Sequence, residues 1–203
     1  VAWRLFMALV LLTGAAPATA AEIREVTVKY AAKRYTMRSE TWFDAPRAGV
    51  FDILTDYAQF DRISSVYDET RFEPPAEDGT LRVYTRVKGC VLFFCQTMAR
   101  TELLENEGLD SIRTTQEPGG EDFRYVVATW DLREEDDGTL VVYEIEMEPA
   151  FWVPPVIGPY VMKRQLIKGG RDAVARIEKL AQESTADPST FRERGLAGFD
   201  VPQ

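Results

Sequence analysis

Six strand-like segments in succession, followed by one long amphipathic helix, limit what this chain can fold into more than any other feature. Short turn-rich pieces separate the segments, and strands joined in this way pair as an antiparallel meander. The six segments are Val66–Phe72, Leu81–Lys88, Phe93–Leu104, Ser111–Gln116, Tyr125–Arg133 and Leu140–Glu148. Such a sheet has one apolar face, which the helix is expected to cover.

Alternating apolar and polar residues give each strand an inner and an outer face. The inner sets are Leu81, Val83, Thr85 and Val87; Val126, Ala128, Trp130 and Leu132; and Val141, Tyr143, Ile145 and Met147. In the segment Phe93–Leu104 we assign Thr97 and Ala99 to the inner face. No carboxylate pair falls on a predicted inner face, so the alternation indicates no general acid–base pair.

The long helix is expected over roughly Pro155 to Glu183. Its apolar residues recur with the spacing of one buried stripe, namely Leu166, Gly170, Ala173, Val174, Ile177, Leu180 and Ala181. The first half is apolar over a wider arc, so we expect it to be the more enclosed half. Ahead of the strands, an extended segment from Thr27 to Phe43 precedes two short helices. The predicted fold class is α+β, with about seven strands and the long helix.

The first twenty residues are typical of a secretory signal peptide. Arg4 forms a short basic region, Leu5–Leu12 an apolar region, and Ala18-Thr19-Ala20 a small-residue cleavage site. We therefore expect cleavage near Ala20 and a periplasmic or secreted mature protein. Residues 21–183 are expected to form the domain, and residues 184–203, which lack periodicity, a flexible C-terminal tail. Three apolar residues of the tail, Phe191, Leu196 and Phe199, could still dock on the domain.

The charges and the side-chain inventory exclude several classes of function. The net charge is −9, and the chain contains no histidine. Nucleic-acid binding needs clustered basic residues, so we expect no nucleic-acid partner. The absence of histidine excludes Ser-His-Asp and Cys-His catalysis and argues against a zinc site, so we expect no metal.

The stretch Asp44–Tyr57, with the sequence DAPRAGVFDILTDY, resembles the first helix of the START-like (SRPBCC) superfamily. The similarity is greatest to the polyketide cyclase/dehydrase and coenzyme-Q-binding branch, and it extends over about Thr27 to Ala181. It implies a helix-grip fold, in which a curved antiparallel sheet wraps around the C-terminal helix and leaves an apolar cavity. It also implies a lipid, an isoprenoid or another hydrophobic ligand, and in some members enzymatic chemistry in the cavity.

Two cysteines, Cys90 and Cys95, bracket four large apolar residues. In one continuous strand they would lie about 16 Å apart, too far for a disulfide, whereas a hairpin tip can bring them together. We predict a disulfide because exported proteins seldom keep free thiols. Strand parity argues mildly against direct facing, and a bulge would reconcile the two faces. The alternative is two small buried thiols.

In a meander, alternate connections fall at the same end of the sheet. The Cys90–Cys95 tip, the Glu117–Arg124 loop and the Pro149–Pro155 approach to the helix therefore share one end, and three acidic turns share the other. The first end collects Val91, Leu92, Phe93, Phe94, Phe151, Trp152 and Val153. Two interpretations stay open: a gate or membrane contact, or side chains that fold inward and plug the barrel.

Candidate ligand contacts follow from the inner faces and from the enclosed half of the helix. They are Val83, Thr97, Ala99, Trp130, Tyr143, Met147, Trp152, Tyr160, Arg164 and Ile167. Arg164 is either a head-group ligand or a surface charge, and no residue is assigned as catalytic. We interpret the chain as an exported, monomeric carrier or sensor of a hydrophobic small molecule, acting without a cofactor. The alternatives are a cyclase or dehydratase that uses Tyr and Arg in the same cavity, and a module that binds a partner protein through its apolar end.

Overall fold

The computed structural model describes residues 20–91, 94–153 and 158–199. The signal-peptide segment lies outside the described residues apart from Ala20, so its assignment stays a prediction. In the described part, no helix is both long and apolar enough to cross a membrane.

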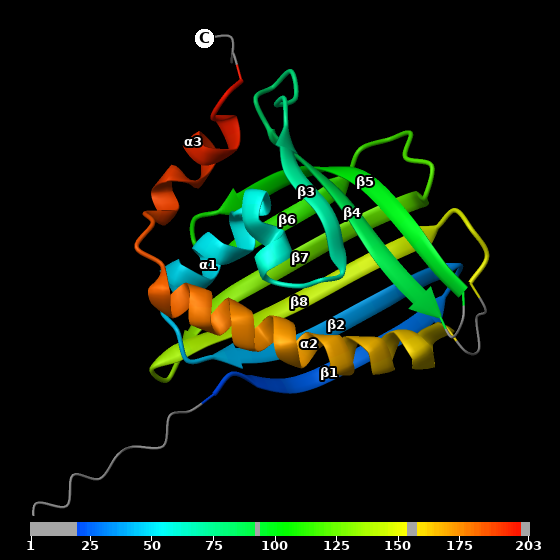
Figure 1. Cartoon of the computed structure of the whole chain (residues 1–203), viewed down its shortest axis with the longest axis horizontal. Helices are drawn as coiled ribbons and strands as arrows, with labels where there is room; N and C mark the ends of the chain where they lie inside the picture. The colour runs from blue at the N-terminus through cyan, green and yellow to red at the C-terminus, as the bar shows by residue number, and fades with distance from the viewer. Residues whose placement is uncertain (1–19, 92–93, 154–157, 200–203) are drawn as a thin grey trace, which may run out of the picture.

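Eight antiparallel strands form one curved sheet in the order β1-β2-β8-β7-β6-β5-β4-β3 (Figure 1). The strands are β1 Glu22–Ala31, β2 Arg34–Phe43, β3 Tyr67–Glu73, β4 Leu81–Val91, β5 Phe94–Glu107, β6 Ser111–Gln116, β7 Phe123–Glu135 and β8 Gly138–Pro149. From β3 to β8 each strand pairs with the next along the chain, which confirms the predicted meander.

The first extended segment is two strands rather than one. A tight turn at Ala32 and Lys33, both with positive φ angles of 51° and 68°, joins β1 to β2. Hairpin turns of this kind usually carry Asn or Gly, and neither is present here. The prediction of about seven strands was therefore one strand short.

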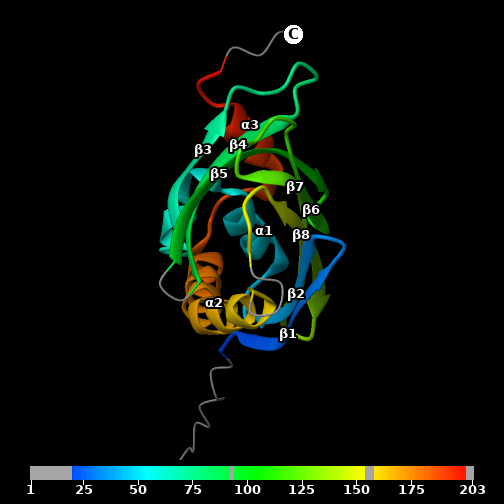
Figure 2. The ribbon, with the colours of Figure 1, turned by 90° about the vertical axis from the view of Figure 1, so that its right-hand side faces the viewer.

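The helices are α1 Arg47–Thr55, η1 Tyr57–Arg62, α2 Gly158–Glu183, η2 Pro188–Thr190 and α3 Phe191–Leu196. Helices α1 and α2 lie in the opening that the curved sheet leaves (Figure 2). Helix α2 packs mainly along β1 and α1. On its predicted stripe, Ile177 and Ala181 are buried. This arrangement is the predicted helix-grip fold, because the sheet curves around a long C-terminal helix.

The apolar core has two parts. At the end that holds α1, Phe51, Leu54 and Ile177 belong to one large cluster of buried side chains. Toward the other end, Met37 and Ile145 belong to a smaller cluster, against which half-buried side chains pack. One end of the interior is thus filled by apolar packing, and the other is more loosely filled.

The C-terminal tail contains η2 and α3, and it docks on the domain through Phe191, one of the three apolar residues considered for this. Phe191 is buried and meets the ring of Phe51 edge-on, with centroids 5.6 Å apart. The Asp52 carboxylate, 4% exposed, accepts a hydrogen bond from Ser184 Oγ at 2.6 Å and forms an ion pair with Arg194 at 2.5 Å. A buried carboxylate requires such partners, and the tail supplies both.

The face assignment of strand β5 was wrong by one residue. Its register pairs Val83 with Glu102 and Thr85 with Arg100, so the two charged residues share the inner face with Val83 and Thr85. Thr97 and Ala99 have the opposite parity and lie on the outer face. The error arose because β5 contains Leu103 and Leu104 in succession, and that pair leaves the parity of the strand ambiguous.

Candidate functional site

A buried ion pair lies on the inner face of β5. Arg100 and Glu102 are two residues apart on one strand, so both side chains project to the same side. The distance from Arg100 Nε to Glu102 Oε2 is 2.8 Å, and the Glu102 side chain is 1% exposed. Burial by itself would lower the pKa of Arg100, but the adjacent carboxylate raises it, and the net shift is upward. Arg100 therefore stays charged.

Neighbouring strands supply further partners for the Glu102 carboxylate. Thr114 Oγ1, on β6, donates to Oε1 at 2.9 Å, and Thr85 Oγ1, on β4, donates to Oε2 at 3.4 Å. Both threonines are 1% exposed. Their hydroxyls and the arginine together offset the cost of removing the carboxylate from water.

Three tyrosines on other elements are near enough to this ion pair for its charges to act on them. They are Tyr57 in η1, Tyr67 on β3 and Tyr143 on β8. Burial is the largest cause that raises the pKa of each phenol, and the charges of Arg100 and Glu102 contribute to all three shifts. All three phenols are therefore neutral at physiological pH. We call these seven residues the polar cluster: Tyr57, Tyr67, Thr85, Arg100, Glu102, Thr114 and Tyr143.

Apolar side chains continue the inner face beside the polar cluster. The ring of Trp130, on β7, lies against that of Tyr143, with centroids 4.9 Å apart and planes 34° apart. Trp130, Tyr143, Met147 and Met98 all face inward, yet each is only half-buried. A water-sized probe therefore reaches the inner face beside them.

A pocket opens at the end opposite α1, where β8 leads into α2. Its lining includes Tyr30, Lys33, Tyr35, Arg124, Glu148, Phe151, Trp152 and Val153. Ala150 N donates to Asp122 O at 2.8 Å, which ties the β6–β7 loop to this segment and confirms that the two connections share one end. The exposed fraction of Trp152 is 78%. This end of the sheet therefore presents a large aromatic side chain to solvent.

Comparison with known proteins agrees with this architecture. The family model described as "Polyketide cyclase / dehydrase and lipid transport" matches residues 34–183. The chain belongs to this family. No curated protein matches the chain at the sequence level.

Solved structures related to this family share the fold at low sequence identity. A START superfamily protein from Mycobacterium smegmatis superposes with a TM-score of 0.59 at 14% identity, covering 71% of this chain and 98% of its own. A STAR-related lipid transfer protein from Xanthomonas axonopodis gives 0.58 at 14%, covering 78% and 99%. The Zhui aromatase/cyclase from a Streptomyces species gives 0.55 at 13%, covering 74% and 94%. The superfamily thus includes both lipid transfer proteins and cyclases.

The residues that the sequence predicted to contact a ligand fall into two groups in the structure. On the inner face lie Val83, Trp130, Tyr143 and Met147, with Val83 fully buried in the packed core. The remaining candidates lie on outer surfaces: Thr97 and Ala99 on the outer face of β5, Trp152 in the loop before α2, and Tyr160, Arg164 and Ile167 on an exposed side of α2.

The expectation that the first half of α2 is enclosed was wrong for these helix positions. Tyr160 is 66% exposed and Ile167 is 37% exposed. Helical geometry turns Tyr160, Arg164 and Ile167 to one side, about a quarter to a third of a turn from the stripe that contains Ile177. Arg164 is therefore a surface charge in this structure, and the inward-facing arginine is Arg100.

The cysteines lie directly opposite each other at the end of the β4–β5 hairpin, where Cys90 pairs with Cys95. Opposed residues of antiparallel strands have Cα atoms about 4.5–5.5 Å apart, within the range that a disulfide spans. The parity argument against direct facing was wrong, because it assumed that Thr97 and Ala99 point inward. The side chains of Val91 and Phe94, and residues Leu92 and Phe93 altogether, lie outside the described part. Whether they form a gate or a plug therefore stays open.

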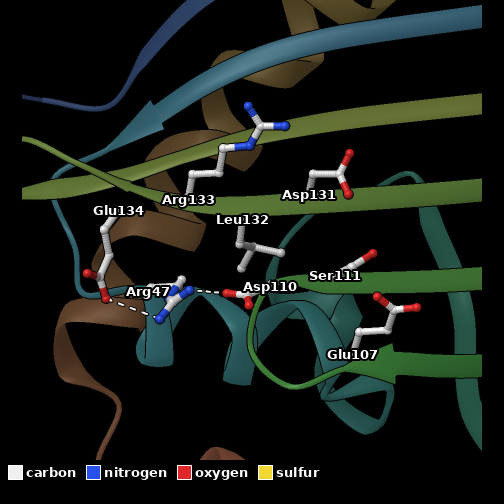
Figure 3. A pocket seen from close by; sticks show the side chains of 8 residues that line it. All are labelled: Arg47, Glu107, Asp110, Ser111, Asp131, Leu132, Arg133 and Glu134. Carbon is white, nitrogen blue, oxygen red and sulfur yellow. Dashed lines mark hydrogen bonds and ion pairs between the residues drawn. The ribbon is translucent and has the colours of Figure 1, made fainter.

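A second surface pocket lies at the α1 end (Figure 3). Arg47 contacts Asp110 there, and its Nη2 lies 3.3 Å from Glu134 Oε1. Arg47 thus pairs with two of the acidic side chains that line this pocket. Among the described residues, no group of three or more potential metal ligands occurs.

The sequence analysis did not identify the two charged residues of the polar cluster, Arg100 and Glu102. Placing Thr97 and Ala99 on the inner face put Arg100 and Glu102, which have the opposite parity, on the outer face. A usable signal was present: if Leu104 is placed inward, alternation also places Glu102 and Arg100 inward.

Proposed function

We propose that this protein binds a hydrophobic small molecule, a lipid or isoprenoid, in a cavity between the concave face of the sheet and α2. The observation that carries the proposal is that Trp130, Tyr143 and Met147 face inward without being fully covered. Large apolar side chains in a folded interior normally pack to full burial, so this accessible surface is suited to an apolar ligand. The role is that of a carrier or sensor.

The polar cluster supports an alternative, a cyclase or dehydratase acting on a hydrophobic substrate in the same place. Arg100 can polarise a carbonyl, and Tyr143 is a neutral phenol that can donate a hydrogen bond to it. The Glu102 carboxylate already accepts hydrogen bonds from two threonines and is paired with Arg100. It is thus held as a structural anion rather than freed as a base, and this favours the carrier role.

Native mass spectrometry of the delipidated protein, mixed with long-chain lipids, tests the proposal. We expect one-to-one complexes. Met147→Trp should abolish them because the larger ring fills the inner face, whereas Glu144→Trp, on the outer face of the same strand, should not. The proposal fails if no lipid binds, or if both variants bind as well as the natural protein.

We further propose export to the periplasm or the exterior, with a disulfide between Cys90 and Cys95, in a monomer that touches membranes transiently. The leader pattern supports export, the strand register supports the disulfide, and exposed Trp152 beside the pocket supports membrane contact. The intact mass of exported protein tests the first two. The membrane contact is tested by vesicle flotation, in which the natural protein is compared with Trp152→Ala. If the variant floats with the vesicles as well as the natural protein does, the proposed contact is refuted.

A further inference from the structure

The polar cluster has more hydrogen-bond donors than its own acceptors use. The Glu102 carboxylate is engaged by Thr114, Thr85 and Arg100. Among the side-chain hydrogen bonds of the described residues, none involves the hydroxyl of Tyr57, Tyr67 or Tyr143. None of the three hydroxyls is among the enclosed polar atoms that lack a partner, so each can be reached by a small probe and is available to a ligand.

The same cluster carries no net charge. The charge of Arg100 is balanced by Glu102 at 2.8 Å, and the three phenols are neutral because burial raises their pKa values. A ligand anion placed here would be a second negative charge beside Glu102, with only one cation to balance both. Burying an unbalanced charge is costly, whereas a neutral acceptor adds no charge.

We propose that the polar cluster holds a neutral oxygen acceptor, a ketone or ester carbonyl at the polar end of the ligand, and that Glu102 makes the site reject carboxylates. The assignment rests on the proposed function, since it requires an apolar ligand on the inner face. A carbonyl oxygen has two lone pairs, and the Tyr143 hydroxyl and the free side of the Arg100 guanidinium donate to them. Glu102 does not touch the ligand: it determines specificity by neutralising Arg100.

Competitive displacement of the neutral fluorophore N-phenyl-naphthylamine tests this assignment. The competitors are a long-chain methyl ketone and the fatty acid of equal chain length, at a pH where the acid is ionised. We expect the ketone to bind at least about tenfold more tightly to the natural protein. Glu102→Gln keeps the shape and an acceptor for Thr114 but leaves Arg100 unbalanced, so the fatty acid should gain about tenfold or more relative to the ketone.

Tyr143→Phe provides a second variant that retains the charges and the packing. It should weaken the ketone roughly three- to tenfold, the loss expected for one hydrogen bond, and leave the affinity for the fluorophore unchanged. Tyr84→Phe removes a hydroxyl from the outer face of β4 and should change neither affinity. The assignment would be overturned if the ketone and the fatty acid bind with equal affinity and neither Glu102→Gln nor Tyr143→Phe changes these affinities. The proposed function would remain intact in that case. Failure of the fluorophore and both competitors to bind would overturn both.

Discussion

At the residue scale, the polar cluster shows how a charged pair can be kept inside an apolar fold. Glu102 accepts hydrogen bonds from two threonines and forms an ion pair with Arg100. The Cζ atom of Arg100 lies 5.7 Å from the centroid of the Phe123 ring. Buried ion pairs of this kind contribute little net stability compared with apolar residues of the same size. Their presence here is better explained by a role in recognition than by stability.

Removing only one member of the pair should be costly. We expect Glu102→Ala to lower the free energy of unfolding by about 3–5 kcal/mol, because it leaves the Arg100 guanidinium buried without its counter-charge. The double variant Arg100→Met with Glu102→Leu should be less destabilised than Glu102→Ala, because no unpaired charge remains. Urea denaturation of the three proteins measures these values. A double variant that is less stable than Glu102→Ala would contradict this account of the pair.

At the element scale, the β4–β5 hairpin and α3 depart most from expectation. In the backbone register of the hairpin, Cys90 pairs directly with Cys95, with no bulge between them. Helix α3 lies against the α1 end of the domain, where a Cβ on Gly195 would approach Leu81 Cδ1 to within 2.8 Å. That close contact explains why a short, mostly polar segment can dock there: glycine at this position lets the helix backbone approach the core.

The hairpin leads to a prediction about the exported protein. When the full chain is expressed in a Gram-negative host, we expect a periplasmic protein whose intact mass corresponds to a chain starting at Ala21. This mass should be two hydrogen atoms lower than that of the reduced form, because one disulfide has closed. The bond should contribute about 2 kcal/mol, since it closes only a short loop. A mass that retains the leader would contradict export, and a mass equal to that of the reduced chain would contradict the disulfide.

At the scale of the whole molecule, alternation and the helical stripe predicted the α+β architecture, the meander and the inner faces of β4, β7 and β8. They did not predict the β1–β2 turn, which lacks Asn and Gly, or the tail contact, which depends on distant Asp52. The site was predicted in part. Trp130, Tyr143 and Met147 follow from local alternation, whereas the inward placement of Arg100 depends on the register with Thr85 on another strand.

The measurement that tests the central claim most directly is photo-crosslinking with a long-chain ketone that carries a diazirine, followed by peptide mapping. A ligand held between the sheet and α2 should label the inner face of β7 and β8, at Trp130, Tyr143 or Met147, and excess unlabelled ketone should suppress the adducts. Labels confined to exposed positions, such as Trp152 or the outer face of β5 at Thr97, would contradict an internal site.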